Sequence, residues 1–170
     1  MKFAKAAMFV SALVAAGLAL TGFASAQIVA LGASNVAGYG VSSTEAWPAQ
    51  LESMLRARGS SAHVANAGIS GNTTGQVLAR LSSAVPVGTK LVILAIGPFN
   101  DLRTGGNTDV AQANLNTIRK QLRDRGVRVI DAYGIMTSIM RQPGMLQGDQ
   151  IHLTAEGHRR LAAQLARSVS

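Results

Sequence analysis

The chain has 170 residues, a formal net charge of +8 and no cysteine. This length suits one domain with a core of its own, and the lack of cysteine excludes a disulfide-stapled scaffold. Aromatic residues make up only 4% of the chain, too few for a surface on which nucleic-acid bases stack. We therefore attribute the basic segments "RKQLRDRGVR" and "HRRLAAQLAR" to solvated helix faces and expect no nucleic-acid partner.

The first 26 residues have the pattern of a signal peptide. Lys2 and Lys5 precede an apolar run, and "ASA" at Ala24–Ala26 suits signal peptidase. The alternative is an uncleaved anchor, because residues 6–26 are nearly long enough to span a bilayer. The small residues favour cleavage, so we expect an exported protein, periplasmic or secreted, that touches the membrane only transiently. Residues 27–170 would then form one domain.

The predicted elements begin with a buried strand over residues 27–31, which Gly32 ends. A helix follows, capped by Ser43 or Thr44. Its inner face carries Trp47, Leu51, Met54 and Leu55 at helical spacing. A second strand covers residues 62–67, and the loop "GISGNTTG" leads into a short helix over residues 76–85.

The second half starts with the clearest strand, residues 90–96, which is apolar on both faces like a central parallel strand. The next helix, over residues 109–126, is expected to turn four side chains inward: Val110, Leu115, Ile118 and Leu122. A fourth strand spans residues 127–132, and a short helix covers residues 133–142. Thr154 is expected to cap the last helix.

Strands that alternate with helices predict a three-layer α/β/α sandwich with a flavodoxin-like parallel sheet of about four strands. In such sheets ligands bind at the carboxyl ends of the strands, where the strand order reverses. With the order 2-1-3-4, Ser34, Gly71 and Asn100 would meet at one rim of the sheet.

Four short stretches, "GASN", "GISGN", "PFND" and "DQIH", resemble in order the four blocks of the SGNH (GDSL-type) hydrolase family. "AWPAQL" and "NAGISGNT…LARL" are similar to the small bacterial periplasmic acyl hydrolases of this family, which resemble lysophospholipase L1 and thioesterase I. The resemblance extends from Ile28 to the last helix.

The resemblance implies a role for each matching residue. Ser34 would be the nucleophile and His152 the general base, with Asp149 orienting the imidazole. The backbone N–H groups of Ser34 and Gly71 and the side-chain amide of Asn100 would form the oxyanion hole. No cofactor and no metal are implied.

Three departures from the family pattern stand out. Ala33 replaces the usual aspartate, which we expect to loosen the loop without removing the mechanism. "GPFND" replaces a glycine-rich form. If the position of Phe99 needs a positive φ, Phe99 would be strained there; otherwise its side chain would line the acyl pocket. The chain between Gly126 and Asp149 is short, which predicts four strands instead of five and an open substrate groove.

Other polar residues carry weaker expectations. His63 and His158 are expected at the surface, Asp101 is expected to brace its loop through local hydrogen bonds, and Asp131 to cap a loop. No residues have the spacing of metal ligands, and no glycine pattern matches a phosphate loop.

The sequence thus predicts an exported serine hydrolase that cleaves carboxylic esters of short or medium acyl chains through an acyl-enzyme. Thioesters remain open as substrates, and so does the oligomeric state. A carbohydrate deacetylase of the same family is one alternative. A non-catalytic binding module of the same fold is another, and a flavodoxin-like nucleotide binder is a distant third.

Overall fold

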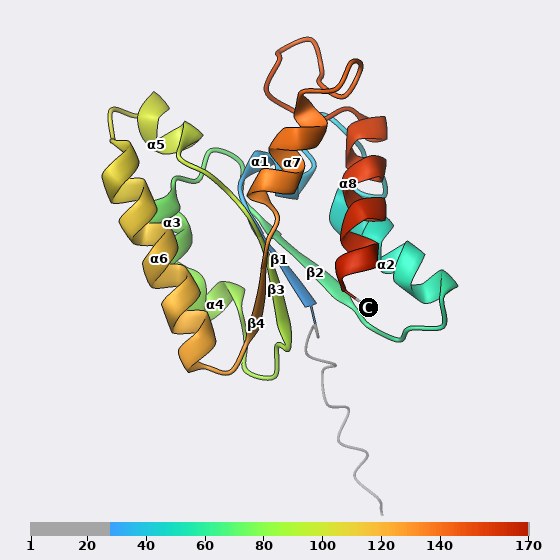
Figure 1. Ribbon diagram of the computed structural model, residues 1–170, viewed down its shortest axis with the longest axis horizontal. Helices are drawn as coiled ribbons and strands as arrows, with labels where there is room; N and C mark the ends of the chain where they lie inside the picture. The colour runs from blue at the N-terminus through green and yellow to red at the C-terminus, as the bar shows by residue number, and fades with distance from the viewer. Residues whose placement is uncertain (1–27, 170) are drawn as a thin grey trace, which may run out of the picture.

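A computed structural model describes residues 28–169, so the predicted signal peptide lies outside the described residues. Its centre is a four-stranded parallel sheet in the order β2-β1-β3-β4 (Figure 1). The strands are β1 (Ile28–Gly32), β2 (Val64–Gly68), β3 (Leu91–Ala95) and β4 (Arg128–Asp131). The predicted fold class, strand number and strand order are confirmed.

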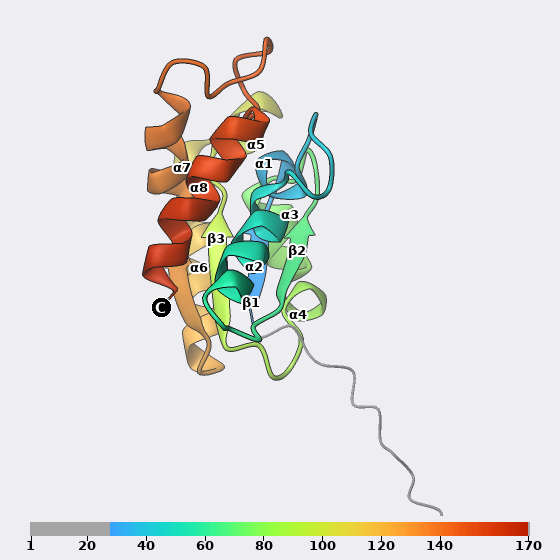
Figure 2. The ribbon, with the colours of Figure 1, turned by 90° about the vertical axis from the view of Figure 1, so that its right-hand side faces the viewer.

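Helices cover both faces of the sheet (Figures 1 and 2). One face carries α2 (Trp47–Ala57), α7 (Tyr133–Met140) and α8 (Ala155–Ser168); the other carries α3 (Thr74–Ala79), α4 (Leu81–Ala84) and α6 (Thr108–Asp124). Two short helices, α1 (Ser34–Ala37) and α5 (Phe99–Arg103), follow the carboxyl ends of β1 and β3.

Each helical layer covers a cluster of buried apolar side chains. One cluster draws its residues from Ile28 to Ala166 of the sequence, and the other from Val29 to Val127. The described part of the chain therefore carries its own core, as an independent domain does. No helix within residues 28–169 is long and apolar enough to cross a bilayer.

Helix caps and buried faces follow the sequence with two corrections. Thr154 caps α8 by accepting from the Gly157 N–H at 3.2 Å, as predicted. By contrast α2 starts after Ala46 with no side-chain cap, because the polar residues before it form a separate turn in which Ser42 bonds Glu45. Val110 was expected in the core but is 55% exposed, since its neighbour Ala111 faces the sheet.

The chain leaving β1 packs unusually closely on the sheet. A Cβ atom on Gly68 would lie 2.2 Å from the backbone nitrogen of Ala37, and one on Gly32 would lie 2.5 Å from the carbonyl oxygen of Ala95. Both distances are shorter than any van der Waals contact. Glycine at these two positions lets α1 pack directly on the end of β2 and leaves room for the Ala95 carbonyl of β3 beside Gly32.

We therefore expect Gly68→Ala to lower the free energy of unfolding by about 3 kcal/mol, because backbone has to move to admit the methyl group. Denaturant unfolding monitored through the buried Trp47 measures the change. The matched control is Gly134→Ala on α7, where a Cβ meets nothing within 4 Å and helix propensity favours alanine by up to about 1 kcal/mol. Equal stability of the two variants would contradict the close packing.

His158 of α8 was expected at the surface, but it is completely buried against the start of α2. Its Nδ1 accepts a hydrogen bond from the Trp47 backbone N–H at 3.2 Å, which fixes the neutral ring with its proton on Nε2. Burial lowers the pKa of His158 from 6.5 to about 4, and the negative charge of Glu45 raises it by a smaller amount.

This shift makes stability pH-dependent in a defined window. The unfolded chain binds a proton at His158 near pH 6.5 and the folded chain only near pH 4, so stability is full above pH 6.5 and falls between these values. The expected loss is roughly 3 kcal/mol. Asp149, whose pKa is lowered from 3.8 to about 2, contributes only at lower pH.

Unfolding free energies measured between pH 7 and pH 4 check this expectation. His158→Asn, whose side-chain oxygen can still accept from Trp47, should flatten the dependence. His63→Asn is the control, because His63 is exposed as expected and pairs with Glu52 at 2.7 Å. An unchanged slope in His158→Asn would show that other groups produce it.

Candidate active site

Ser34 is the first residue of α1, directly beyond the end of β1. Gly32 is paired with Gly68 of β2 and Ala95 of β3, so the loops after all three strands leave the sheet at the same rim. The first N–H groups of a helix have no partner within it. Ala33 precedes α1 and provides no side-chain cap, because its methyl group cannot accept a hydrogen bond.

Gly71 and Asn100 lie on the two neighbouring loops. Gly71 has a φ of +82°, and a Cβ there would meet nothing within 4 Å, so its backbone is open to a ligand. The Asn100 side chain donates one amide hydrogen to the Asn72 carbonyl at 2.9 Å, which leaves its second amide hydrogen available. Ser34, Gly71, Asn100 and His152 all line one hollow.

Asp101 braces this rim over a long range, not through the local bonds that were expected. Its buried carboxylate accepts from the Thr74 hydroxyl at 2.6 Å and from the Thr74 N–H at 3.0 Å. These bonds join the start of α5 to the start of α3, 27 residues apart in the chain. Asn114 of α6 donates to the same Thr74 hydroxyl at 3.1 Å.

Arg80 is a second brace that the sequence analysis did not identify. Its guanidinium donates to the Asn72 side chain at 2.7 Å and to the carbonyls of Gly32 and Ala67 at 2.9 and 3.0 Å. It thus joins the ends of β1 and β2 to the loop that carries Gly71. Partial burial lowers the pKa of Arg80.

The departure at "GPFND" does not strain the backbone. Among residues 28–169 Gln150 is the one non-glycine residue with a positive φ, and Phe99 begins α5 in helical conformation. Its ring is 49% exposed and lines two adjoining hollows that meet at Ser34.

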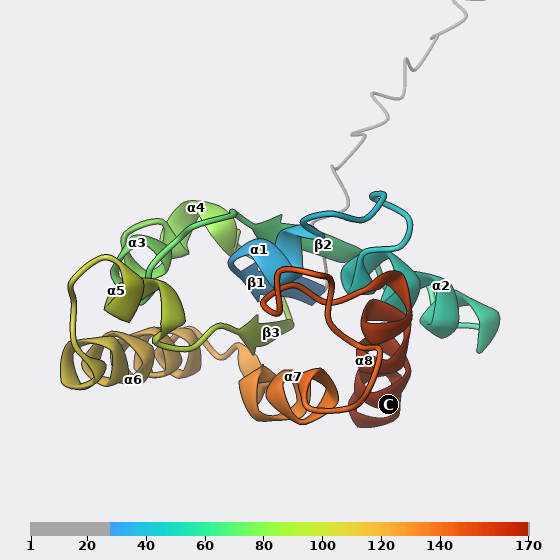
Figure 3. The same ribbon diagram turned by 90° about the horizontal axis from the view of Figure 1, so that it is seen from above.

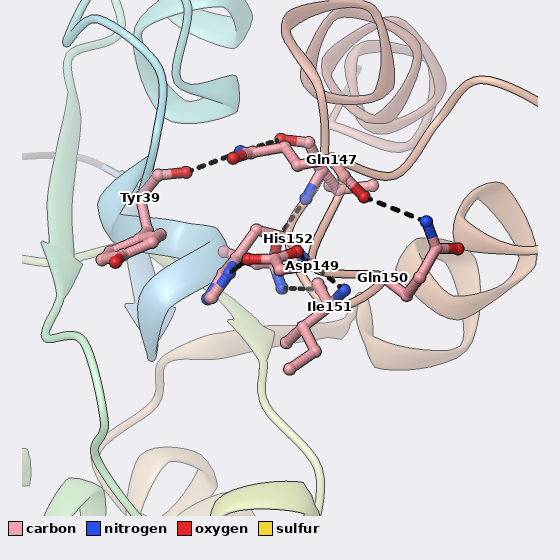
Figure 4. A network of polar contacts seen from close by, with 8 residues as sticks. Tyr39, Gln147, Asp149, Gln150, Ile151 and His152 are labelled. Atoms are coloured by element: carbon pink, nitrogen blue, oxygen red, sulfur yellow. Dashed lines mark hydrogen bonds and ion pairs between the residues drawn. The ribbon is translucent and has the colours of Figure 1, made fainter.

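Asp149 and His152 are in direct contact. The Asp149 carboxylate lies 2.6 Å from Nδ1 of His152 and also accepts from the backbone N–H groups of Ile151 and His152 (Figure 4). The bond from the ring, followed by those from the backbone, lowers the pKa of Asp149 to about 2. Gln150, with a φ of 58°, makes the tight turn between them.

Two amides clamp the loop that carries His152. Asn35, next to Ser34, accepts from the Leu153 N–H at 2.8 Å and donates to the Ile151 carbonyl at 3.2 Å. Gln147 donates to the carbonyls of Tyr39 and Leu153 at 2.9 and 2.8 Å. Viewed from above, the segment between α7 and α8 crosses over α1 (Figure 3).

The Tyr39 ring lies against the imidazole, with ring centroids 4.4 Å apart. This contact and the clamp fix the imidazole at the hollow that contains Ser34. Within the described residues the two side chains share this hollow without a direct hydrogen bond.

On the other side of Ser34 lies a second, apolar hollow of about 180 Å³. Its larger apolar lining residues are Ile96, Phe99, Tyr133, Met136, Met140 and Ile151. Of the remaining candidates, Asp131 accepts from the Tyr133 N–H at 3.2 Å, as a loop cap does. Residues 28–169 contain no cluster of three or more side chains suited to a metal ion.

Comparison with known proteins decides the family. The model of the GDSL-like Lipase/Acylhydrolase family matches residues 30–144. The chain belongs to this family. The matched stretch includes Ser34, Gly71 and Asn100 but ends before the Asp149–His152 pair.

Individual relatives agree with this SGNH hydrolase assignment. An arylesterase of Vibrio mimicus is 35% identical over 108 residues, 63% of this chain and 54% of its own, so the chain spans about half the length of that relative. The crystal structure of TesA superposes with a TM-score of 0.73 at 24% identity, covering 84% of this chain and 97% of TesA. The SGNH-hydrolase family esterase AlinE4 gives 0.60 at 26% identity, covering 85% and 95%.

We expect Asn35→Ala to release the loop that carries His152, because the Leu153 N–H loses its acceptor. Amide hydrogen exchange at Leu153 should accelerate by about tenfold, the equivalent of one lost hydrogen bond. Asn116→Ala on the exposed face of α6 is the control and should leave this exchange unchanged. Unaltered exchange at Leu153 in Asn35→Ala would show that Gln147 alone holds the loop.

Proposed function

We propose that this SGNH hydrolase cleaves carboxylic esters through an acyl-enzyme formed on Ser34. The observation that carries the proposal is the Asp149–His152 contact of 2.6 Å, made at a hollow that Ser34, Gly71 and Asn100 also line. A hydroxyl, an oriented imidazole and several hydrogen-bond donors around one small space are the parts that acyl transfer requires.

In the proposed reaction the Ser34 oxygen attacks the ester carbonyl while Nε2 of His152 takes the hydroxyl proton. Asp149 holds the proton on Nδ1 and stabilises the imidazolium that forms. The tetrahedral intermediate then expels the alcohol, which receives the proton from His152. Water deprotonated by His152 attacks the acyl-enzyme, releases the carboxylic acid and restores Ser34.

The negative charge on the substrate oxygen requires donors that are already in place. Ser34 and Gly71 would supply backbone N–H groups, and Asn100 its second amide hydrogen. Arg80 and Asp101 support the proposal by fixing the loops that carry these donors. Their hydrogen bonds hold these loops in place, so the loops need little reorganisation when charge develops.

The two hollows suggest how the ester is placed. The apolar hollow beside Met136 and Met140 suits the acyl group, and its volume of about 180 Å³ suits a short or medium chain. The other contains Tyr39, Ser70 and Arg103 and suits a more polar leaving group. Phe99 and Ile151 line both and would separate the two parts of the substrate.

Hydrolysis of p-nitrophenyl esters tests the proposal. Ser34→Ala and His152→Ala should each lower kcat by several orders of magnitude, and Asp149→Asn by about 10⁴, because the imidazole then takes the wrong tautomer. Rates should fall as the acyl chain grows beyond medium length. Thioester and acetylated-sugar substrates, assayed beside these esters, identify the favoured leaving group.

A fluorophosphonate probe provides an independent measurement, since it labels only an activated serine. Labelling of the unaltered chain, lost in Ser34→Ala, is the expected result. Full activity in Ser34→Ala would contradict the proposal. An unlabelled, inactive but folded chain would instead favour a binding module with the same fold.

A further inference from the structure

Cationic side chains gather at the end of the domain opposite to Ser34. In a parallel α/β domain strands begin and helices end at the same pole. Five basic residues lie at this end of the domain (Figure 1). They are Lys90 before β3, Arg128 at the start of β4, Arg58 after α2, and Arg123 and Arg125 at the end of α6. We call these five residues the basic pole.

Carboxylates do not neutralise the basic pole. None of its five cations forms an ion pair within residues 28–169; the nearby Glu52 and Asp124 pair with Arg56 and Lys120 instead. Three of the five donate to backbone carbonyls at the ends of other elements: Arg58 to Ala166, Arg125 to Val85 and Arg128 to Ser168. Lys90 and Arg123 make no side-chain hydrogen bond in the same range.

Apolar surface accompanies this charge. Val87, on the turn that leads to Lys90, is 94% exposed. A hollow at the same pole combines Arg58, Lys90 and Arg128 with apolar side chains from the strand starts and helix ends: Ile28, Leu55, Leu91 and Val169. Ile28, Leu55 and Leu91 are themselves buried, so Val87 provides the exposed apolar side chain here. Cations beside an exposed apolar side chain match the boundary between lipid headgroups and acyl chains.

The position of the amino-terminal segment adds a third argument. β1 begins at Ile28, which lines this hollow, so the apolar sequence over residues 6–26 joins the domain at the basic pole. Any contact of that sequence with a bilayer brings the basic pole to the lipid surface.

We propose that the basic pole is a docking surface for an anionic lipid bilayer, which leaves the Ser34 rim facing the aqueous phase. Nucleic acid, the other polyanion, fits less well. The exposed aromatic rings of the described residues, Tyr39 and Phe99, lie at the opposite end, so the basic pole provides no ring on which a base stacks. The proposal does not depend on the chemistry at Ser34.

Vesicle co-sedimentation of the chain beginning at Gln27, which retains both apolar clusters, tests this surface without the leader sequence. The chain should bind phosphatidylglycerol-containing vesicles, should not bind pure phosphatidylcholine vesicles, and should dissociate as salt is raised. Lys90→Gln combined with Arg123→Gln should weaken binding by about tenfold or more. Val87→Ser should weaken it severalfold with the same salt dependence.

The matched control is Arg159→Gln combined with Arg160→Gln, which removes the same charge from the first half of α8, where both arginines pair with Glu156. It should leave binding within about twofold, and equal melting temperatures show that each variant is folded. Equal losses in the two double variants would overturn the proposal, because net charge alone would then explain binding. Absence of vesicle binding, or tighter binding to a DNA duplex than to vesicles, would also overturn it.

Discussion

The site depends on the close contact between α1 and the ends of the strands beneath it. Gly32 and Gly68 have no Cβ, and the atoms of α1 and β3 occupy the space where one would lie. This contact fixes the height of Ser34 above the sheet. Both β2 and β3 pair with β1 up to Gly32. The loops that follow β2 and β3 therefore leave the sheet beside Ser34.

Polar contacts then position the loops that leave this rim. On one side Arg80 binds the carbonyls at the ends of β1 and β2, and Asp101 binds the first N–H of α3. On the other side Asn35 and Gln147 tie the segment that carries His152 to the chain around α1. Each brace joins a side chain to backbone of a different element. These bonds hold both loops at the rim of the four-stranded sheet.

The sequence was sufficient for the sheet and the rim because both follow from the alternation of strands and helices. The braces were not predictable in the same way. Asn35 and Asp101 act on residues 118 and 27 positions away, and no local pattern reports such contacts. The burial of His158 was predictable, because it has helical spacing to Leu161, Ala162 and Leu165 and so lies on the same face of α8. We expected it at the surface because Arg159 and Arg160 follow it directly.

The same topology separates the Ser34 rim from the basic pole. Residues that terminate helices collect at one pole, where cations also offset the negative ends of helix dipoles, and residues that follow strands collect at the other. In this chain the Ser34 rim and the basic pole therefore lie at opposite ends of the sheet. If the basic pole lies on a bilayer, the rim faces away from it, so the esters it meets arrive from solution. The apolar hollow of about 180 Å³ beside Ser34 opens at this rim, so an acyl group would enter it from the aqueous side.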